Sequence, residues 1–172
     1  KTPSGWTGGK MGVDRPLTHG PEQMTRLRDI VLGNAGIERS GGRIEHVAGL
    51  REAYIDDLCG DFRMTRRLRV VCATGNGTAS AFAPEILERI GIEVIPLHCE
   101  LDHSFPHYNP NPEALEMLHD MAAKLRETGA DLALGFDGDG DRCGVGADDR
   151  IEVFPDKVGG ILARDYRRRF PA

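Results

Sequence analysis

Short apolar runs alternate with amphipathic stretches through the middle of the chain. Val70–Ala73, Ile92–Leu97 and Ala130–Gly135 have the length and apolar character of buried strands. Ala79–Ile90 and Leu115–Leu125 instead repeat apolar residues every three or four positions, as helices do. Strands that alternate with helices predict an α/β domain, and helical crossovers make the three strands parallel.

A fourth apolar run completes the predicted sheet. Cys143–Ala147 follows the third strand after a tight loop, so it can return antiparallel to its neighbour. The stretch 105–112 is too rich in proline for a regular element. We therefore predict a three-layer α/β domain, with a small mixed, mainly parallel four-stranded sheet flanked by helices.

Further helical patterns flank this region. One begins at Pro21, one covers about Val47–Phe62, and the last runs from Pro155 towards Arg169, after a strand-like run at Ile151–Phe154. The helix over Val47–Phe62 is expected to have an apolar side, formed by Leu50, Tyr54, Ile55 and Leu58.

The Gly-rich connector Ser40–Gly42 indicates a domain boundary. We expect the end of a first domain over 1–46, a complete α/β domain over 47–152, and the start of a third domain over 153–172.

Composition limits the classes of function. Apolar content of 40% and charged content of 28% are those of a soluble globular protein. A net charge of −5 and the lack of a basic stripe argue against a nucleic-acid binder. No stretch approaches the ~20 apolar residues that span a bilayer. The four cysteines lack CxxC spacing, and Cys72, Cys99 and Cys143, which lie in or beside strand-like runs, are expected to be buried in a cytoplasmic protein.

The most informative stretch is an acidic loop that follows the third predicted strand. Asp137, Asp139 and Asp141 alternate with glycines, and Arg142 follows them. Side chains at the carboxyl end of such a strand point into the crevice where open α/β sheets bind ligands. Three crowded carboxylates repel one another unless a hard cation shares them, so the loop predicts a site for Mg²⁺, Mn²⁺ or Ca²⁺.

Two other known motifs fit the acidic loop less well. An EF-hand would need Gly at position six and Glu at position twelve, where this chain has Arg142 and Asp148. A haloacid-dehalogenase-type phosphatase would use Asp137 as nucleophile, but its usual Thr would fall at Asp141. The phosphatase stays open as an alternative.

The loop Gly135–Arg142 resembles the metal loop of the α-D-phosphohexomutases, the phosphomannomutase/phosphoglucomutase family. Val70–Ala79 resembles the first strand and Gly-Asn-Gly turn of that family's second domain, and Ile151–Asp156 resembles the start of its third. Gly8–Lys10 is similar to a segment just beyond the family's phosphoserine loop. A strand and a proline-rich loop match as well, over Ile95–Leu97, Asp102, Phe105-Pro106 and Pro110–Pro112.

The resemblance implies an enzyme that moves a phosphoryl group between C1 and C6 of a hexose phosphate. The reaction would pass through a phosphoserine enzyme and a hexose 1,6-bisphosphate. Asp137, Asp139 and Asp141 would hold Mg²⁺, Arg142 would steady the phosphate, and Lys10 would act as an electrostatic or acid/base group.

The resemblance is incomplete. The serine that carries the phosphate in the family would fall just before residue 1, and the sugar- and phosphate-binding loops would lie after residue 172. We therefore expect no mutase turnover from these residues alone, and the alternative is an isolated, weak divalent-metal-binding module. Neither the hexose nor the oligomeric state can be read from the sequence.

Two weaker signals favour structural roles. Gly75–Gly77 matches no phosphate-binding motif and is expected to be a strand-to-helix turn. His103 and His107 are expected to be surface histidines.

Overall fold

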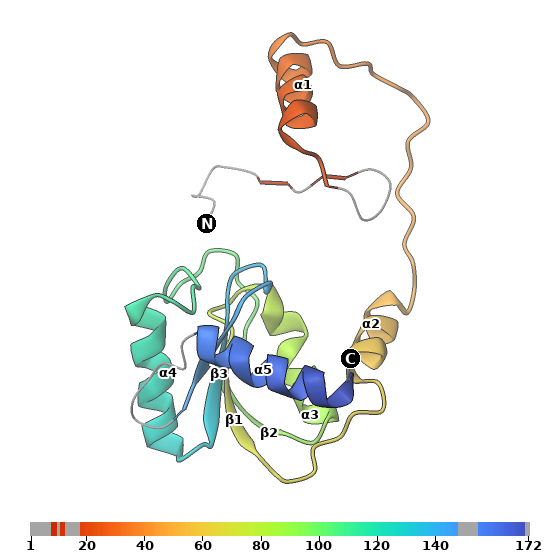
Figure 1. Ribbon diagram of the computed structural model, residues 1–172. Coiled ribbons are helices and arrows are strands. Elements are labelled where there is room, and N and C mark those ends of the chain that lie inside the picture. The colour runs from red at the N-terminus through yellow and green to blue at the C-terminus, as the bar shows by residue number, and fades with distance from the viewer. Residues whose placement is uncertain (1–7, 10, 13–17, 148–154, 171–172) are drawn as a thin grey trace. The chain divides into compact units, whose positions relative to one another are not determined.

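The computed structural model, which describes residues 8–9, 11–12, 18–147 and 155–170, contains a four-stranded sheet (Figure 1). Its strands are β1 (Arg69–Ala73), β2 (Glu93–Leu97), β3 (Leu132–Phe136) and β4 (Cys143–Gly146), in the spatial order β2-β1-β3-β4. β1 pairs in parallel with both β2 and β3, and β4 returns antiparallel to β3. The predicted mixed, mainly parallel sheet is confirmed.

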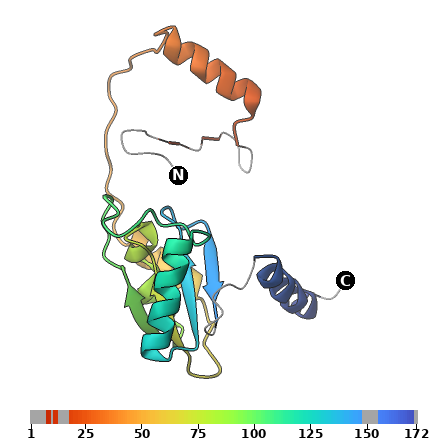
Figure 2. The same cartoon turned by 90° about the vertical axis from the view of Figure 1, so that its left-hand side faces the viewer.

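Helices cover both faces of this sheet, which makes three layers (Figures 1 and 2). On one face, α4 (Leu115–Thr128) packs Met117, Met121 and Leu125 against Val71 and Ala73 of β1. On the other face, α3 (Ala83–Arg89) packs Ala83 and Leu87 against Cys72. Successive side chains of a strand point to opposite faces, so β1 contributes to both apolar clusters.

The helical stretch expected over Ala79–Ile90 consists of two elements. A short 3₁₀ helix, η1 (Thr78–Ala81), ends at Phe82, and α3 begins at Ala83. Pro84 explains the break, because it has no N–H to donate and its ring would clash with the carbonyl four residues earlier. Proline is tolerated in the first turn of α3, where that N–H is not needed.

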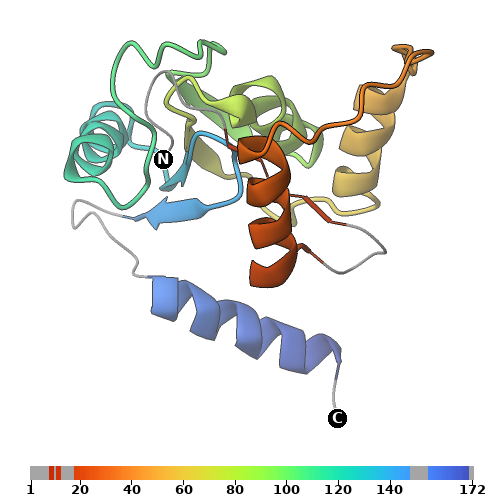
Figure 3. The same cartoon turned by 90° about the horizontal axis from the view of Figure 1, so that it is seen from above.

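The helix predicted over Val47–Phe62 is shorter, and much of its apolar side is exposed. It forms α2 (Leu50–Cys59), between Gly49 and Gly60, and lies against α3 on the side away from α4 (Figure 3). Ile55 and Cys59 are its buried residues, whereas half or more of the surface of Leu50, Tyr54 and Leu58 is exposed. Apolar spacing thus predicted the helix, and only part of its apolar side is buried.

The proline-rich loop has no regular element, as predicted, yet it contributes to the core. Tyr108, Pro110 and Pro112 are buried. The prediction for the cysteines is wrong for Cys143, which is exposed because β4 is an edge strand of the sheet. Cys72 is buried and Cys99 is half-buried.

The chain divides into two units, residues 1–47 and residues 48–172. In the first unit, α1 (Pro21–Leu32) confirms the helix predicted to begin at Pro21, and the Gly20 N–H bonds the Gln23 side chain at its start. In the second unit, α5 (Pro155–Arg169) confirms the last predicted helix. Lys10 and the predicted strand Ile151–Phe154 lie outside the described residues. None of the described helices is long and apolar enough to cross a membrane.

Candidate functional site

The acidic loop leaves β3 at the edge of the sheet where the three parallel strands end. Asp137, the first residue after β3, is 1% exposed, whereas Asp139 and Asp141 are exposed to solvent. Each of the three offers a carboxylate oxygen, and these oxygens all lie within 4.8 Å of one another. The structure therefore brings the three predicted carboxylates together at the edge where α/β sheets bind ligands.

Arg142 closes the loop by binding Asp137 from both its backbone and its side chain. The Arg142 Nε donates to Asp137 Oδ2 at 2.8 Å, and the Arg142 backbone N–H donates to Oδ1 at 3.2 Å. The side-chain bond raises the pKa of Arg142 above its ordinary value. Because a buried carboxylate is costly without a compensating charge, the guanidinium stabilises Asp137 in its ionised form.

The proline-rich loop also reaches this arginine. Arg142 Nη1 lies 3.5 Å from the Asn111 side-chain oxygen and 3.6 Å from a Glu113 carboxylate oxygen. Sequence reasoning did not identify Asn111 or Glu113. Their only signal was the resemblance of the surrounding Pro-Asn-Pro segment to a family loop.

The turn that follows β1 supports the acidic loop from the neighbouring strand. The Thr78 N–H and hydroxyl both donate to the Gly138 carbonyl oxygen, at 3.0 and 2.9 Å. A Cβ atom at Gly77 would lie 2.9 Å from Gly138 Cα, so the two backbones touch. Within the loop, the Gly140 N–H donates to the Asp137 carbonyl at 3.0 Å.

Donors of the Gly75–Gly77 turn bind carbonyl groups of the protein, which supports the structural role expected for the turn. Asn76 is buried in a left-handed conformation, with its backbone N–H on the His98 carbonyl at 2.7 Å and its side-chain amide on the Glu100 carbonyl at 2.7 Å. The Gly77 N–H donates to the Thr74 carbonyl at 2.9 Å. These backbone donors are therefore not directed at a phosphate.

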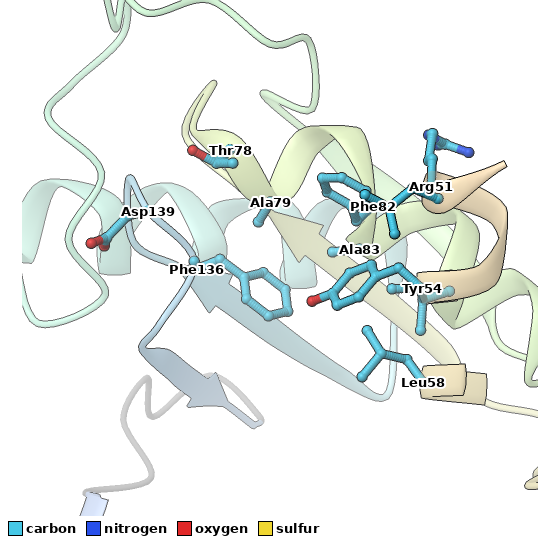
Figure 4. A pocket seen from close by; sticks show the side chains of 12 residues that line it. Arg51, Tyr54, Leu58, Thr78, Ala79, Phe82, Ala83, Phe136 and Asp139 are labelled. Carbon is cyan, nitrogen blue, oxygen red and sulfur yellow. The ribbon is translucent and has the colours of Figure 1, made fainter. Parts of the chain in front are cut away.

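A pocket of about 710 Å³ opens beside the acidic loop (Figure 4). Tyr54 and Leu58 of α2 and Phe136 of β3 face the same space. Asp139 of the acidic loop lies at one end of the pocket. Its walls are largely apolar, so it offers few groups for acid–base or phosphoryl chemistry. Of the three carboxylate residues only Asp139 lines it, so we place the candidate site in the loop rather than in this pocket.

The donor set fits a hard divalent cation. Three carboxylates close together on a bent loop are the ligand type that Mg²⁺, Mn²⁺ and Ca²⁺ prefer. Asp137 is preorganised by Arg142, while Asp139 and Asp141 are accessible from solvent. The candidate histidines do not join this group: His103 and His107 are exposed, and His107 stacks on His98 with 3.6 Å between the ring centroids.

The fold and the site together define a three-layer α/β domain with a cluster of oxygen ligands at the carboxyl edge of its sheet. A family model described as phosphoglucomutase/phosphomannomutase, alpha/beta/alpha domain II, matches residues 52–150. A phosphomannomutase/phosphoglucomutase of Pseudomonas putida is 36% identical over 95% of this chain, and a phosphoglucomutase of Neisseria gonorrhoeae is 37% identical over 69% of it.

A solved structure agrees with this result. The crystal structure of a phosphoglucomutase/phosphomannomutase family protein from Burkholderia thailandensis superposes with a TM-score of 0.79 and 32% identity, over 86% of this chain and 32% of that one. The chain thus belongs to the phosphoglucomutase/phosphomannomutase family. It spans 38% of the length of the Pseudomonas putida relative and 26% of the Neisseria gonorrhoeae relative.

Proposed function

We propose that this chain supplies the metal-binding loop of a phosphohexomutase. The whole enzyme would move a phosphoryl group between C1 and C6 of a hexose phosphate, through a phosphoserine enzyme and a hexose 1,6-bisphosphate. The convergence of three carboxylates, from Asp137, Asp139 and Asp141, carries the proposal, because it occurs in a chain of the phosphoglucomutase/phosphomannomutase family.

The three aspartates would hold Mg²⁺. A bound Mg²⁺ supplies a hard positive charge that stabilises the negative charge spread over a phosphoryl group in transfer. Asp137 would be the fixed ligand, because the sheet and Arg142 immobilise it. Asp139 and Asp141 would complete the site from the solvent side.

Arg142 would have two roles in the proposed enzyme. Its Nε holds Asp137, and its Nη1 lies 3.5 Å or more from Asn111 and Glu113, which are weak contacts. A guanidinium can bind two phosphate oxygens at once, so its outer nitrogens would steady the phosphoryl group beside the cation. Lys10 remains a prediction from the resemblance, as an electrostatic or acid/base group.

Calorimetric titration with Mg²⁺ tests the metal site on the intact chain. Asp139→Asn keeps the shape of the side chain and removes one ligand charge, so it should weaken Mg²⁺ binding by about 10-fold or more, as changes around metal ligands commonly do. The matched control is Asp61→Asn, an exposed aspartate outside the cluster, which should bind as the unchanged chain does. Equal Mg²⁺ affinity for all three proteins would remove the metal assignment.

The phosphatase alternative makes a different prediction about Asp137. It requires a covalent acyl-phosphate on this carboxylate, whereas a metal-binding Asp137 carries none. Incubation with acetyl phosphate and Mg²⁺, followed by intact-mass measurement, distinguishes the two. A phosphorylated chain that is lost in Asp137→Asn would support the phosphatase and contradict the mutase.

A further inference from the structure

Two cysteines meet beside the carboxyl ends of β1 and β2. Cys72 belongs to β1 and is fully buried, and Cys99 follows β2 and is half-buried. The Cys99 Sγ lies 3.1 Å from the Cys72 carbonyl oxygen, and its side chain packs on the same apolar cluster as the Cys72 side chain.

The backbone fixes this arrangement. β2 ends at Leu97, and His98 adopts a left-handed conformation with φ of +52°, which is uncommon for a residue other than glycine. The chain bends there, so Cys99 turns back onto β1. Asp120 of α4 holds the His98 ring through a 2.7 Å contact to Nε2, and the stacked His107 ring covers it. Contacts from two other segments therefore maintain the position of Cys99.

We propose that Cys72 and Cys99 form a peroxide-sensitive thiol pair that closes into an intrachain disulfide. The Cys99 thiolate attacks one oxygen of hydrogen peroxide, the O–O bond breaks, and the products are a sulfenic acid and hydroxide. The Cys72 sulfur then attacks the Cys99 sulfur, an S–S bond forms, and the sulfenic oxygen leaves with the Cys72 proton as water. The two sulfurs together give two electrons, which reduce one peroxide molecule.

Exposure assigns different roles to the two sulfurs, because Cys99 is half-buried whereas Cys72 is fully buried and less accessible to peroxide. Hydrogen bonds from Cys72 and then from Thr74 lower the pKa of Cys99 from its ordinary value, despite partial burial. The same bond with Cys99, together with burial, raises the pKa of Cys72. Since the thiolate is the reactive form, Cys99 is the sulfur that meets peroxide, and Cys72 is the one that resolves it.

The sheet order makes Cys143 a poor competitor. Cys143 lies at the start of β4, and β3 stands between β4 and β1. Cys59, in turn, is buried in α2, where its Sγ faces the Ile86 carbonyl at 3.9 Å. Cys72 is thus the sulfur that the fold places next to Cys99.

The residues that flank Cys99 are hydrogen-bonded to the turn that supports the acidic loop. The carbonyls on either side of Cys99, from His98 and Glu100, accept the two hydrogen bonds that Asn76 donates. Gly77, the next residue, touches Gly138. Formation of the disulfide would therefore strain the backbone that holds the loop, although the proposal itself does not depend on what the loop binds.

Peptide mapping tests the pair on the unmodified chain. The reduced protein is treated with hydrogen peroxide, blocked with N-ethylmaleimide and digested with trypsin, which releases Cys72 in residues 70–89 and Cys99 in residues 90–124. We expect a cross-linked peptide two hydrogen atoms lighter than the sum of these two. The proposal would be overturned if the two peptides stayed separate and reduced, or if Cys99 were oxidised only to sulfinic or sulfonic acid. A link between Cys99 and Cys143 would overturn it as well.

Variants identify the order of the two steps. Cys143→Ser should form the cross-link as the unchanged chain does. In Cys72→Ala, Cys99 should still react with peroxide and accumulate as a sulfenic acid that dimedone traps. If dimedone instead labelled Cys72 in Cys99→Ser as strongly as Cys99 in Cys72→Ala, the assigned roles would be wrong.

Discussion

At the scale of single residues, Gly77 connects the turn after β1 to the acidic loop. Its backbone has φ of −78° and ψ of −176°, which any residue adopts, so the glycine is not needed for conformational reasons. The constraint is space, because a Cβ would lie 2.9 Å from Gly138 Cα and 3.1 Å from the Gly138 and Thr74 carbonyl oxygens. All three are backbone atoms that cannot rotate away.

Gly77→Ala should therefore destabilise the protein and loosen the acidic loop. We expect the free energy of unfolding to fall by about 1–3 kcal/mol, the usual cost of overpacking, and the Mg²⁺ affinity to fall with it. Chemical denaturation and calorimetric titration measure the two effects. Gly36→Ala is the control, since a Cβ there meets nothing within 4 Å. If the Gly77→Ala protein were as stable as the Gly36→Ala protein, the turn after β1 and the acidic loop could move apart without a cost in stability.

The residues of the acidic loop could be predicted because their signal is local. Three aspartates within five positions follow a strand, and their carboxylates lie close together at the end of that strand. The support for the loop could not be predicted in this way. Asn76, Gly77 and Thr78 act through atoms of segments that are distant in sequence, and no pattern marks the left-handed conformation of His98 or the contact between Cys72 and Cys99.

At the scale of elements, ion pairs attach α2 to α3. Arg89 of α3 binds Glu52 at 2.9 Å and Asp56 at 2.5 Å, both on α2, and Arg51 of α2 binds Glu85 of α3 at 2.8 Å. Arg51 also lies over the Phe82 ring, 5.6 Å from its centroid. Apolar spacing could not reveal this attachment, because it depends on charged side chains of two helices that are distant in the sequence.

This attachment should weaken in acid. Hydrogen bonds from Arg51 and then Arg89 lower the pKa of Glu85 from its ordinary value of 4.5. A carboxylate whose pKa is lowered by folding stabilises the fold above its unfolded pKa and loses that contribution as the pH falls through its folded pKa. We therefore expect the midpoint of thermal unfolding to fall as the pH drops below about 4.5, and to fall less in Glu85→Gln.

Glu88→Gln is the matched control for this pH dependence. Glu88 lies on the same helix and is exposed, outside the ion pairs between α2 and α3. It should lose stability in acid as the unchanged chain does. If Glu85→Gln followed the same acid profile as Glu88→Gln, the ion pairs would contribute nothing measurable, as is common for exposed pairs.

At the scale of the whole molecule, the sheet domain contains the core. The buried apolar side chains of the described residues run from Ile55 to Ala133, within the second unit. Alternation of strands and helices was enough to predict the class of fold and the parallel pairing, because helical crossovers allow little else. The strand order β2-β1-β3-β4 was not predicted, since it depends on which apolar runs pair across the intervening helices.

A chain shortened to residues 48–172 should keep this fold. We expect it to unfold in one cooperative transition, near the temperature at which the sheet domain of the full chain unfolds, as followed by circular dichroism. A chain shortened to residues 64–172 is the contrast, because it also loses Ile55 and Cys59 of α2, which are buried. Burial of an aliphatic side chain is worth about 1.5–3 kcal/mol, so this second chain should melt at a clearly lower temperature.

The pairing of β1 with β3 also sets the order in which the acidic site can form as the chain folds. β2, α3 and α4 all lie between these two strands in the sequence, so their pairing closes a long loop and forms slowly. Gly77 and Thr78 can meet Gly138 only once it has formed. A cation that binds the finished loop therefore arrives after the slow step, and it should lengthen the lifetime of the native state without making the chain fold faster.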